Sequence, residues 1–577
     1  MTLRSSLGES TQEVQSQSGL SDKAPHDARA DNSDAAPGAR IPIDIRRFPW
    51  IRRLAIDYAF DFPRIADFFS GNPADSSAWR EAIARTQAHP RQRDRIVDLL
   101  HAQQRTRGAH ARAVDASTEL GDPRSVAIVT GQQAGLFGGP LYTLLKALTA
   151  IRLAEHVRAE HHVPAVPIFW IDAEDHDWNE VKSCQVLDAE LTLLSIAAGD
   201  PRGAHNGPVA RVRLDDSITT ALSALESALP PTEFTPALLD GLRKAYSPGT
   251  GMVDAFGVLI EQLLAPLGLV VFDSSDQDAK PLVAQLFAQE IAQPGRTSRL
   301  AAEAGRALEA RDYHAQVSPQ EDSTALFHLN GGRQGIKVHP HGFQVGDEVQ
   351  AAAALIDHIK ETPEAFSPNV LMRPLVQDTL FPTACYVAGP NELAYLAQLR
   401  NVYEAFSVPM PLVQPRASAT ILDTNAMRFL GRYDIQMESL RAQDEAVLNE
   451  VLEAQLPPSV DAALDEATRA IQQRMDRLAQ DVQVIDSTLE GATRSTLGRM
   501  QDDLKKLNGK IIQAAKRKDD TLRRQFRHAR SQSFPGGEPQ ERVVSFVYFL
   551  NKYGPALVDR LSRDLPLDAG THWVVTI

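Results

Sequence analysis

Short apolar runs that alternate with helical patterns are the feature that most restricts the fold of this chain. Most are rich in β-branched residues and lead into glycines or polar side chains; they lie at 125–130, 166–171, 268–273, 384–388 and 408–413. Such runs are typical of buried strands, and strands that alternate with helices form a parallel, doubly wound α/β sheet. Because ligands bind beyond the carboxyl ends of such strands, the segments that follow them are the candidate functional residues.

The first predicted strand leads into a glycine-rich turn and then a helix that Pro140 begins. Glycines let the backbone approach a ligand closely, and the first turn of a helix presents unpaired N–H groups to an anion. The unit predicts a phosphate or carboxylate site, although its spacing matches neither the P-loop nor GxGxxG. A tight turn without a ligand is the alternative. The candidate binding residues are Gly131, Gln132, Gln133, Gly135, Gly138, Gly139, Tyr142, Thr143 and Lys146.

Four ionisable residues, Glu174, Asp175, His176 and Asp177, follow the second predicted strand. Some of them should face a cleft, where they could act as a general base, bind an amine or hold Mg²⁺. The alternative is a solvated acidic turn that caps the next helix. The local spacing matches no standard zinc pattern. We predict that these four residues form the catalytic group.

Further candidates for binding lie between residues 369 and 420. Arg373 stands in an apolar stretch and could hold a substrate carboxylate with two hydrogen bonds, whereas an internal ion pair with Asp378 is the alternative. The other candidates follow the last two predicted strands or lie beside Arg373: they are Gln377, Asp378, Gly389, Glu392, Tyr395, Arg416 and Ser418.

Composition excludes several classes of protein. The net charge of −14 argues against a chain that coats nucleic acid or an anionic membrane. The only cysteines, Cys184 and Cys385, rule out a disulfide framework and a thiolate-rich zinc site, and we interpret both as buried small hydrophobes. No apolar stretch reaches the roughly 18 residues that span a bilayer. The N-terminus lacks the apolar core of a signal peptide, so we expect a cytoplasmic protein.

The pattern along the chain predicts four parts. Residues 1–42 are polar and should form a disordered tail. Residues 43–420 form the α/β core, residues 421–534 a helical arm, and residues 535–577 a segment that returns to the core. Apolar residues recur every seven positions from Leu464 to Ile485 and again from Leu497 to Ile511, around a break near Gly491. This repeat predicts an antiparallel coiled-coil arm that drives homodimerisation; a hairpin whose apolar stripes satisfy each other is the alternative.

Several motifs, in this order along the chain, resemble those of the BshC family of bacillithiol biosynthesis. They are TGQQAGL at 130–136, GPLYT at 139–143, FWI at 169–171 with EDHD at 174–177, RPLVQD at 373–378, AGP at 388–390 with Glu392 and Tyr395, PRASAT at 415–420 and HWVVTI at 572–577. The resemblance extends from about residue 43 to the end of the chain.

The resemblance implies a Rossmann-like core with connecting inserts, similar to class I aminoacyl-tRNA synthetases, and a coiled-coil arm used in dimerisation. It also implies that the enzyme adds L-cysteine to glucosaminyl-malate. Two features of the sequence differ from the proteins that this resemblance brings to the comparison. The polar N-terminal tail is additional, and two cysteines cannot build the zinc site of cysteinyl-tRNA synthetases or of the mycothiol cysteine ligase, so we expect no zinc.

Amide formation needs an activated carboxylate, and ATP, with or without Mg²⁺, is the usual source. The resulting hypothesis is a carbon–nitrogen ligase that forms a cysteinyl-adenylate over the glycine turn, which the glucosamine amine then attacks. Lys146 and the loop N–H groups would hold phosphate, and Arg373 and Arg416 the malate carboxylates or phosphate. Two alternatives are a nucleotide- or sugar-phosphate-binding transferase of the same fold and a coiled-coil scaffold with a degenerate catalytic core.

Overall fold

A five-stranded parallel sheet lies at the centre of the computed structural model, which describes residues 40–205, 207–329 and 332–577. The strand order is β13-β12-β2-β3-β6. The strands are β2 (Val126–Gln132), β3 (Ala165–Ile171), β6 (Val270–Asp273), β12 (Thr383–Ala388) and β13 (Leu412–Pro415). This confirms the parallel α/β fold. Strand β13 starts at Leu412, later than the predicted start at residue 408. Val408 and Met410 are apolar because they pack into the core ahead of the strand, and this made the apolar run longer than the strand itself.

Helices cover both faces of the sheet, which explains why its strands read as continuous apolar runs. On one face, Val126 and Ile128 pack against α5 (Leu141–His161). On the other face, Ala127 and Val129 share a core with α10 (Lys280–Ala292) and α13 (Arg373–Leu380). The central strand β2 is therefore fixed from both sides, and so is the position of its carboxyl end.

Two inserts extend this core. Between α11 (Arg296–Glu309) and α13 lies an antiparallel sheet of order β10-β9-β8-β7-β11. Its strands are β7 (Ser323–Leu329), β8 (Arg333–His339), β9 (Gly342–Val345), β10 (Glu348–Gln350) and β11 (Phe366–Pro368). The second insert contains the hairpin of β4 (Ser183–Leu187) and β5 (Leu193–Ala197). The sequence pattern alone did not locate either sheet.

The two ends of the described chain meet in a third sheet. Strand β15 (Thr571–Thr576) pairs with β1 (Arg40–Asp44) on one side and with β14 (Ser418–Leu422) on the other. Residues 40–42 therefore belong to a strand, and their assignment to the tail was wrong because this short run gains its pairing partner only from the far end of the chain. The rest of the predicted tail, 1–39, lies outside the described residues.

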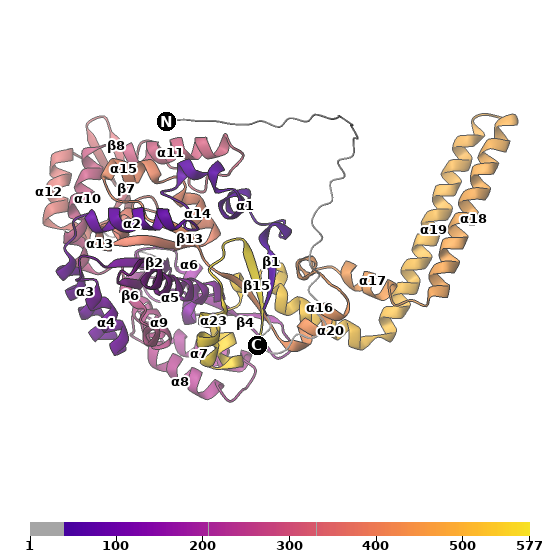
Figure 1. Cartoon of the computed structure of the whole chain (residues 1–577), viewed down its shortest axis with the longest axis horizontal. Helices are drawn as coiled ribbons and strands as arrows, with labels where there is room; N and C mark the ends of the chain where they lie inside the picture. Colours follow the sequence, from indigo (N-terminus) through magenta and orange to yellow (C-terminus); the bar gives the residue numbers. More distant parts are fainter. Residues whose placement is uncertain (1–39, 206, 330–331) are drawn as a thin grey trace, which may run out of the picture.

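The arm is a two-helix hairpin that projects from the core (Figure 1). Its helices α18 (Pro458–Asp481) and α19 (Leu489–Lys518) run antiparallel, and Gln501 Nε2 donates to Gln472 Oε1 across them at 2.6 Å. The predicted break near Gly491 was wrong: the helices are joined by residues 482–488, and Gly491 lies inside α19. Within the described part of the chain, no helix is long and apolar enough to cross a membrane.

Candidate active site

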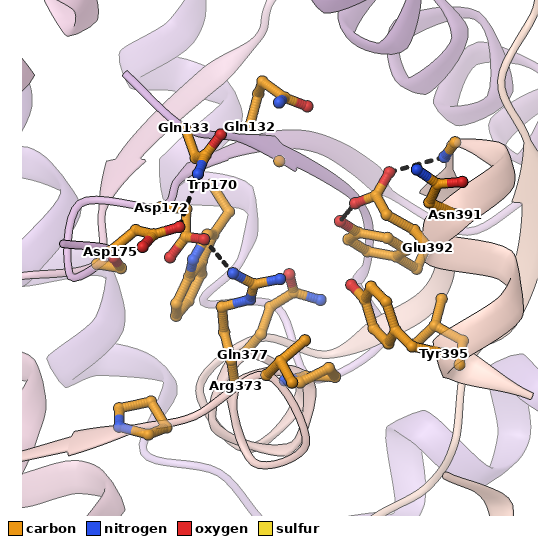
Figure 2. A pocket seen from close by; sticks show the side chains of 18 of the residues that line it. Gln132, Gln133, Trp170, Asp172, Asp175, Arg373, Gln377, Asn391, Glu392 and Tyr395 are labelled. Atoms are coloured by element: carbon orange, nitrogen blue, oxygen red, sulfur yellow. Dashed lines mark hydrogen bonds and ion pairs between the residues drawn. The ribbon is translucent and has the colours of Figure 1, made fainter. Parts of the chain in front are cut away.

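A cavity of about 780 Å³ opens at the carboxyl ends of β2, β3 and β12. Strand β2 has β3 on one side and β12 on the other, so the sheet changes its direction of winding at this point. Ligands of doubly wound sheets bind at such a switch point. The volume suits a small-molecule ligand, and charged side chains of both signs surround it (Figure 2).

The structure brings most of the predicted site residues to this cavity. Those that line it are Gly131, Gln132, Gln133, Tyr142, Lys146, Glu174, Asp175, Arg373, Gln377, Asp378, Gly389, Glu392, Tyr395 and Arg416. Those that do not line it are Gly135, Gly138, Gly139, Thr143, His176, Asp177 and Ser418. The second group shows where local sequence patterns mislead, as the following contacts explain.

The first turn of α5 does not face the cavity. The Leu141 N–H donates to the carbonyl of Val544 at 2.8 Å, and the Phe546 N–H donates to the carbonyl of Gly139 at 3.3 Å. The ring of Phe546 lies so close to Gly138 that an added Cβ would stand 2.1 Å from it. The predicted anion site at this helix N-terminus is therefore corrected: the C-terminal segment at 540–553 occupies the space in which the anion would bind.

Lys146 is buried and already paired. Its Nζ lies 2.5 Å from Glu392 Oε2 and 2.5 Å from the carbonyl oxygen of Gly131. Glu392 also accepts hydrogen bonds from the Tyr386 hydroxyl at 2.6 Å and from the Gly389 N–H at 2.7 Å. Burial lowers the pKa of Lys146, while the Glu392 carboxylate opposes that shift. Lys146 thus holds Glu392 and the end of β2 in place, which replaces its predicted role as a free cation for phosphate.

Arg373 pairs with Asp172, the residue that directly follows β3. Arg373 is the first residue of α13, and the Arg373 guanidinium points toward Asp172 at the end of β3 (Figure 2). The alternative ion pair with Asp378 is wrong. Asp378 instead accepts from the Tyr403 hydroxyl at 2.5 Å and from the Gln377 amide at 2.9 Å, and burial raises its pKa to about 6.

The acidic turn after β3 divides into different roles. Glu174 is buried against Lys280 Nζ at 2.5 Å, and burial raises its pKa. Asp175 faces the cavity and accepts from Gln133 Nε2 at 2.6 Å, and the same amide donates to Glu180 at 2.9 Å. Burial acts to raise the pKa of Asp175, but this bond and two backbone N–H groups outweigh it and lower the pKa. Asp175 therefore stays ionised at neutral pH.

The other two members of the turn lie outside the cavity. Asp177 accepts from the Glu180 N–H at 3.1 Å and caps the short helix α6 (Trp178–Val181), as the capping alternative predicted. His176 keeps 63% of its side chain exposed and lies 3.3 Å from a guanidinium nitrogen of Arg333. An exposed imidazole beside a cation does not support the predicted catalytic role of His176.

Arg416 and Ser418 are held by Glu541. Both terminal nitrogens of Arg416 bond the carboxylate of Glu541, at 2.9 and 2.6 Å, and Ser418 Oγ donates to the same carboxylate at 3.1 Å. Glu541 lies in α21 (Gln540–Val543), in the segment that returns from the arm. Arg416 is therefore neutralised by its own chain, which corrects its predicted role as a holder of substrate anions.

The residues of the cavity that were missing from the sequence-based set include Trp170, Asp172, Glu180, Arg333 and Arg542. Asp172 could have been found, because it begins the polar run after a strand. The two arginines belong to an insert strand and to the return segment, where no local motif marks them. The buried Trp170 Nε1 and Arg333 Nε have no hydrogen-bond partner among the described residues, so both are donors available to a ligand.

The geometry suits a ligand that carries groups of both signs. Asp175 and Glu180 gather on one side of Gln133, while Arg333 and Arg373 approach the same strand ends from the insert and from α13. No group of three or more His, Cys, Asp or Glu side chains in the described residues is arranged to hold a metal ion. The arrangement can bind an ammonium and carboxylates together.

Two family models match the chain. The model described as "Bacillithiol biosynthesis BshC, N-terminal Rossmann-like domain" matches residues 42–417, and the BshC C-terminal coiled-coil model matches residues 419–577. The chain belongs to the BshC family. The two models divide it between β13 and β14, where the core passes into the third sheet and the arm.

Curated proteins from several bacteria are similar to this chain over most of its length. One from Salinibacter ruber is 37% identical over 91% of this chain and 96% of its own length, and one from Koribacter versatilis is 32% identical over 90% and 96%. A third, from Bacillus velezensis, is 27% identical over 87% and 93%. Each is named "Putative cysteine ligase BshC".

The cysteines of the chain itself are not part of the site. Cys184 and Cys385 are free and buried, as predicted. Burial raises the pKa of the Cys184 thiol to about 12 and that of Cys385 well above its ordinary value. A buried protonated thiol is a poor nucleophile.

Proposed function

We propose that this BshC chain is a ligase that joins the carboxyl group of L-cysteine to the amine of glucosaminyl-malate. The observation that carries the proposal is a cavity lined by both carboxylates and guanidinium groups at the switch point of the sheet, in a chain that matches the family over residues 42–417 and 419–577. The bond formed is an amide, so the site has to bring a carboxyl carbon and an amine nitrogen together and accept the two protons that the ammonium loses, one before its nitrogen attacks and one as the amide forms.

The cavity offers a distinct place for each charged group. Asp175 and Glu180, joined through Gln133, form the anionic side that would hold an ammonium group. Asp175 stays ionised and would bind the charge, which leaves Glu180 as the carboxylate that would take a proton. Arg333 and Arg373 form the cationic side that would hold carboxylates. Glu174 is compensated by Lys280 and supports the floor of the site instead of reacting.

We further propose ATP as the co-substrate that activates the cysteine carboxylate. Attack of that carboxylate on the α-phosphate would release pyrophosphate, and attack of the amine would then release AMP. The glycine turn offers no place for the phosphates, because Val544 caps the helix behind it. The guanidinium groups of the cavity are the remaining candidates. Any Mg²⁺ would enter with the nucleotide.

Binding to the purified full chain tests this proposal. L-cysteine and glucosaminyl-malate should each bind the wild-type protein, and Arg373→Met should weaken glucosaminyl-malate about tenfold or more, the loss expected for charge-assisted hydrogen bonds. Arg563→Met, in an arginine outside the cavity, is the matched control. A chain that bound neither substrate would be a scaffold and not a ligase.

We also propose that the protein is a cytoplasmic homodimer joined through the arm. Met500 and Leu507 lie seven residues apart on α19 and keep 43% and 47% of their surface exposed, while Leu497 is buried in the hairpin. An apolar stripe left uncovered by the hairpin supports a second copy as its partner.

A further inference from the structure

Among the described residues, five cationic side chains line the cavity, and four of them have at least one partner within the chain. Lys146 pairs with Glu392, Arg373 with Asp172 and Arg416 with Glu541. The fourth, Arg333, donates to the Pro368 carbonyl at 2.8 Å and lies against His176. The fifth, Arg542, is exposed at the cavity wall, and no described residue pairs with its guanidinium.

The backbone that carries Arg542 is nevertheless held firmly. Its neighbour Glu541 is buried under Arg416 and also accepts from the Ala419 N–H at 3.0 Å. One residue earlier, Gln540 accepts from the N–H of Ile421 and donates to its carbonyl, both at 2.8 Å. Because the backbone is already fixed, only the side chain of Arg542 has to be ordered when a ligand binds, and this favours a ligand-binding role.

Tyr142 is one polar side chain that lines the cavity together with Arg542. Tyr142 lines the same wall and accepts from Gln132 Nε2 at 3.2 Å, which leaves its own O–H free to donate. The Leu141 N–H donates to the Val544 carbonyl at 2.8 Å, so Tyr142 and Arg542 lie on backbone segments that bond each other, and both side chains line the cavity. Burial raises the pKa of Tyr142, and the positive charges of Arg416 and Arg542 oppose that shift. Since Glu541 already neutralises Arg416, the charge that faces the cavity here is that of Arg542.

We propose that Arg542 and the Tyr142 hydroxyl bind an anionic oxygen group of a substrate at the wall of the cavity, either a carboxylate or a phosphate. The proposal rests on the proposed ligase function and extends it, because it gives the segment that returns from the arm a direct part in the site. The Arg416–Glu541 pair acts as the positioning element, since it fixes the backbone of α21 beside the cavity.

Calorimetric titration of the full chain with L-malate and with ATP separates the two sources of the anion. Arg542→Met should weaken one of the two ligands about tenfold or more, as expected for the loss of charge-assisted hydrogen bonds. Arg542→Lys should retain part of that affinity at low salt and lose it at high salt, because screening removes a point charge first. Arg524 is exposed, lies in α20 (Asp520–Ser533) and does not line the cavity. The control variant Arg524→Met should therefore bind both ligands as the wild type does.

The outcomes distinguish this inference from the ligase proposal. Unchanged affinity of Arg542→Met for both ligands, with wild-type binding intact, overturns the anion site and leaves the ligase proposal standing. Weakened anion binding in a chain that forms no coupled product refutes the ligase reaction and supports the anion site. A melting temperature within about a degree of the wild type confirms that Arg542→Met is folded, as expected for an exposed side chain without internal partners.

Discussion

The pair of Lys146 and Glu392 should be one of the main supports of the site, and Lys146→Met tests this. Methionine keeps most of the aliphatic volume, so the change removes the charge and leaves little cavity. Breaking a buried ion pair costs about 3–5 kcal/mol, because the remaining charge has no partner. Lys146 is 1% exposed, whereas Glu392 keeps 21% of its side chain exposed and can be partly hydrated. We therefore expect a loss of about 3 kcal/mol, the lower end of that range.

Urea unfolding followed by tryptophan fluorescence measures this loss. The double variant Lys146→Met/Glu392→Gln should recover about half of it, because glutamine can still accept from Tyr386 and Gly389 without leaving a buried charge. Lys182→Met breaks the exposed pair with Asp200 and should cost less than about 1 kcal/mol. A cost for Lys146→Met equal to this control, or no recovery in the double variant, would refute the reasoning.

Three further predictions concern pH, backbone and assembly. Burial lowers the pKa of His572 to about 4 from its usual value near 6.5, so the unfolded chain binds a proton first. Stability should then fall by about 3 kcal/mol as pH drops from about 6.5 to about 4, and His572→Gln should flatten that slope in urea titrations. Gly138→Ala should lower the melting temperature more than Gly139→Ala, because both residues have positive φ but only Gly138 faces the Phe546 ring; equal shifts would contradict this. Deletion of residues 459–531 should convert a dimer to a monomer in light scattering, and an unchanged mass would disprove the arm as the interface.

Local sequence patterns predicted the parts of the fold that local physics controls. Strands β2, β3, β6 and β12 are buried on both faces, so their composition alone marks them. The polar segments after these strands lie at one edge of the sheet, as the parallel topology requires, and this placed Asp175, Gln133 and Glu392 at the cavity. Heptad spacing likewise located the two helices of the arm, with an error only at the turn between them.

The errors arose where a distant segment decides the outcome. The N-terminus of α5 has the composition of an anion site, but Val544, some four hundred residues later in the chain, occupies it. Arg373 stands five positions from Asp378 in the sequence, yet the direction of α13 turns it toward Asp172. Arg416 lies at the cavity, as predicted, but its charge is not free to bind a ligand. Glu541, which follows the arm in the sequence, pairs with it and neutralises it. Such pairings depend on tertiary contacts that no local pattern contains.

Mass spectrometry of the coupled product tests the central claim most directly. Purified protein would be incubated with L-cysteine, glucosaminyl-malate and ATP, with the cysteine carboxylate labelled with oxygen-18. The account predicts a product with the mass of the amide, oxygen-18 in the released AMP, and loss of both signals in Arg373→Met but not in Arg524→Met. Absence of the amide from the wild-type reaction, or full activity of Arg373→Met, would contradict the account.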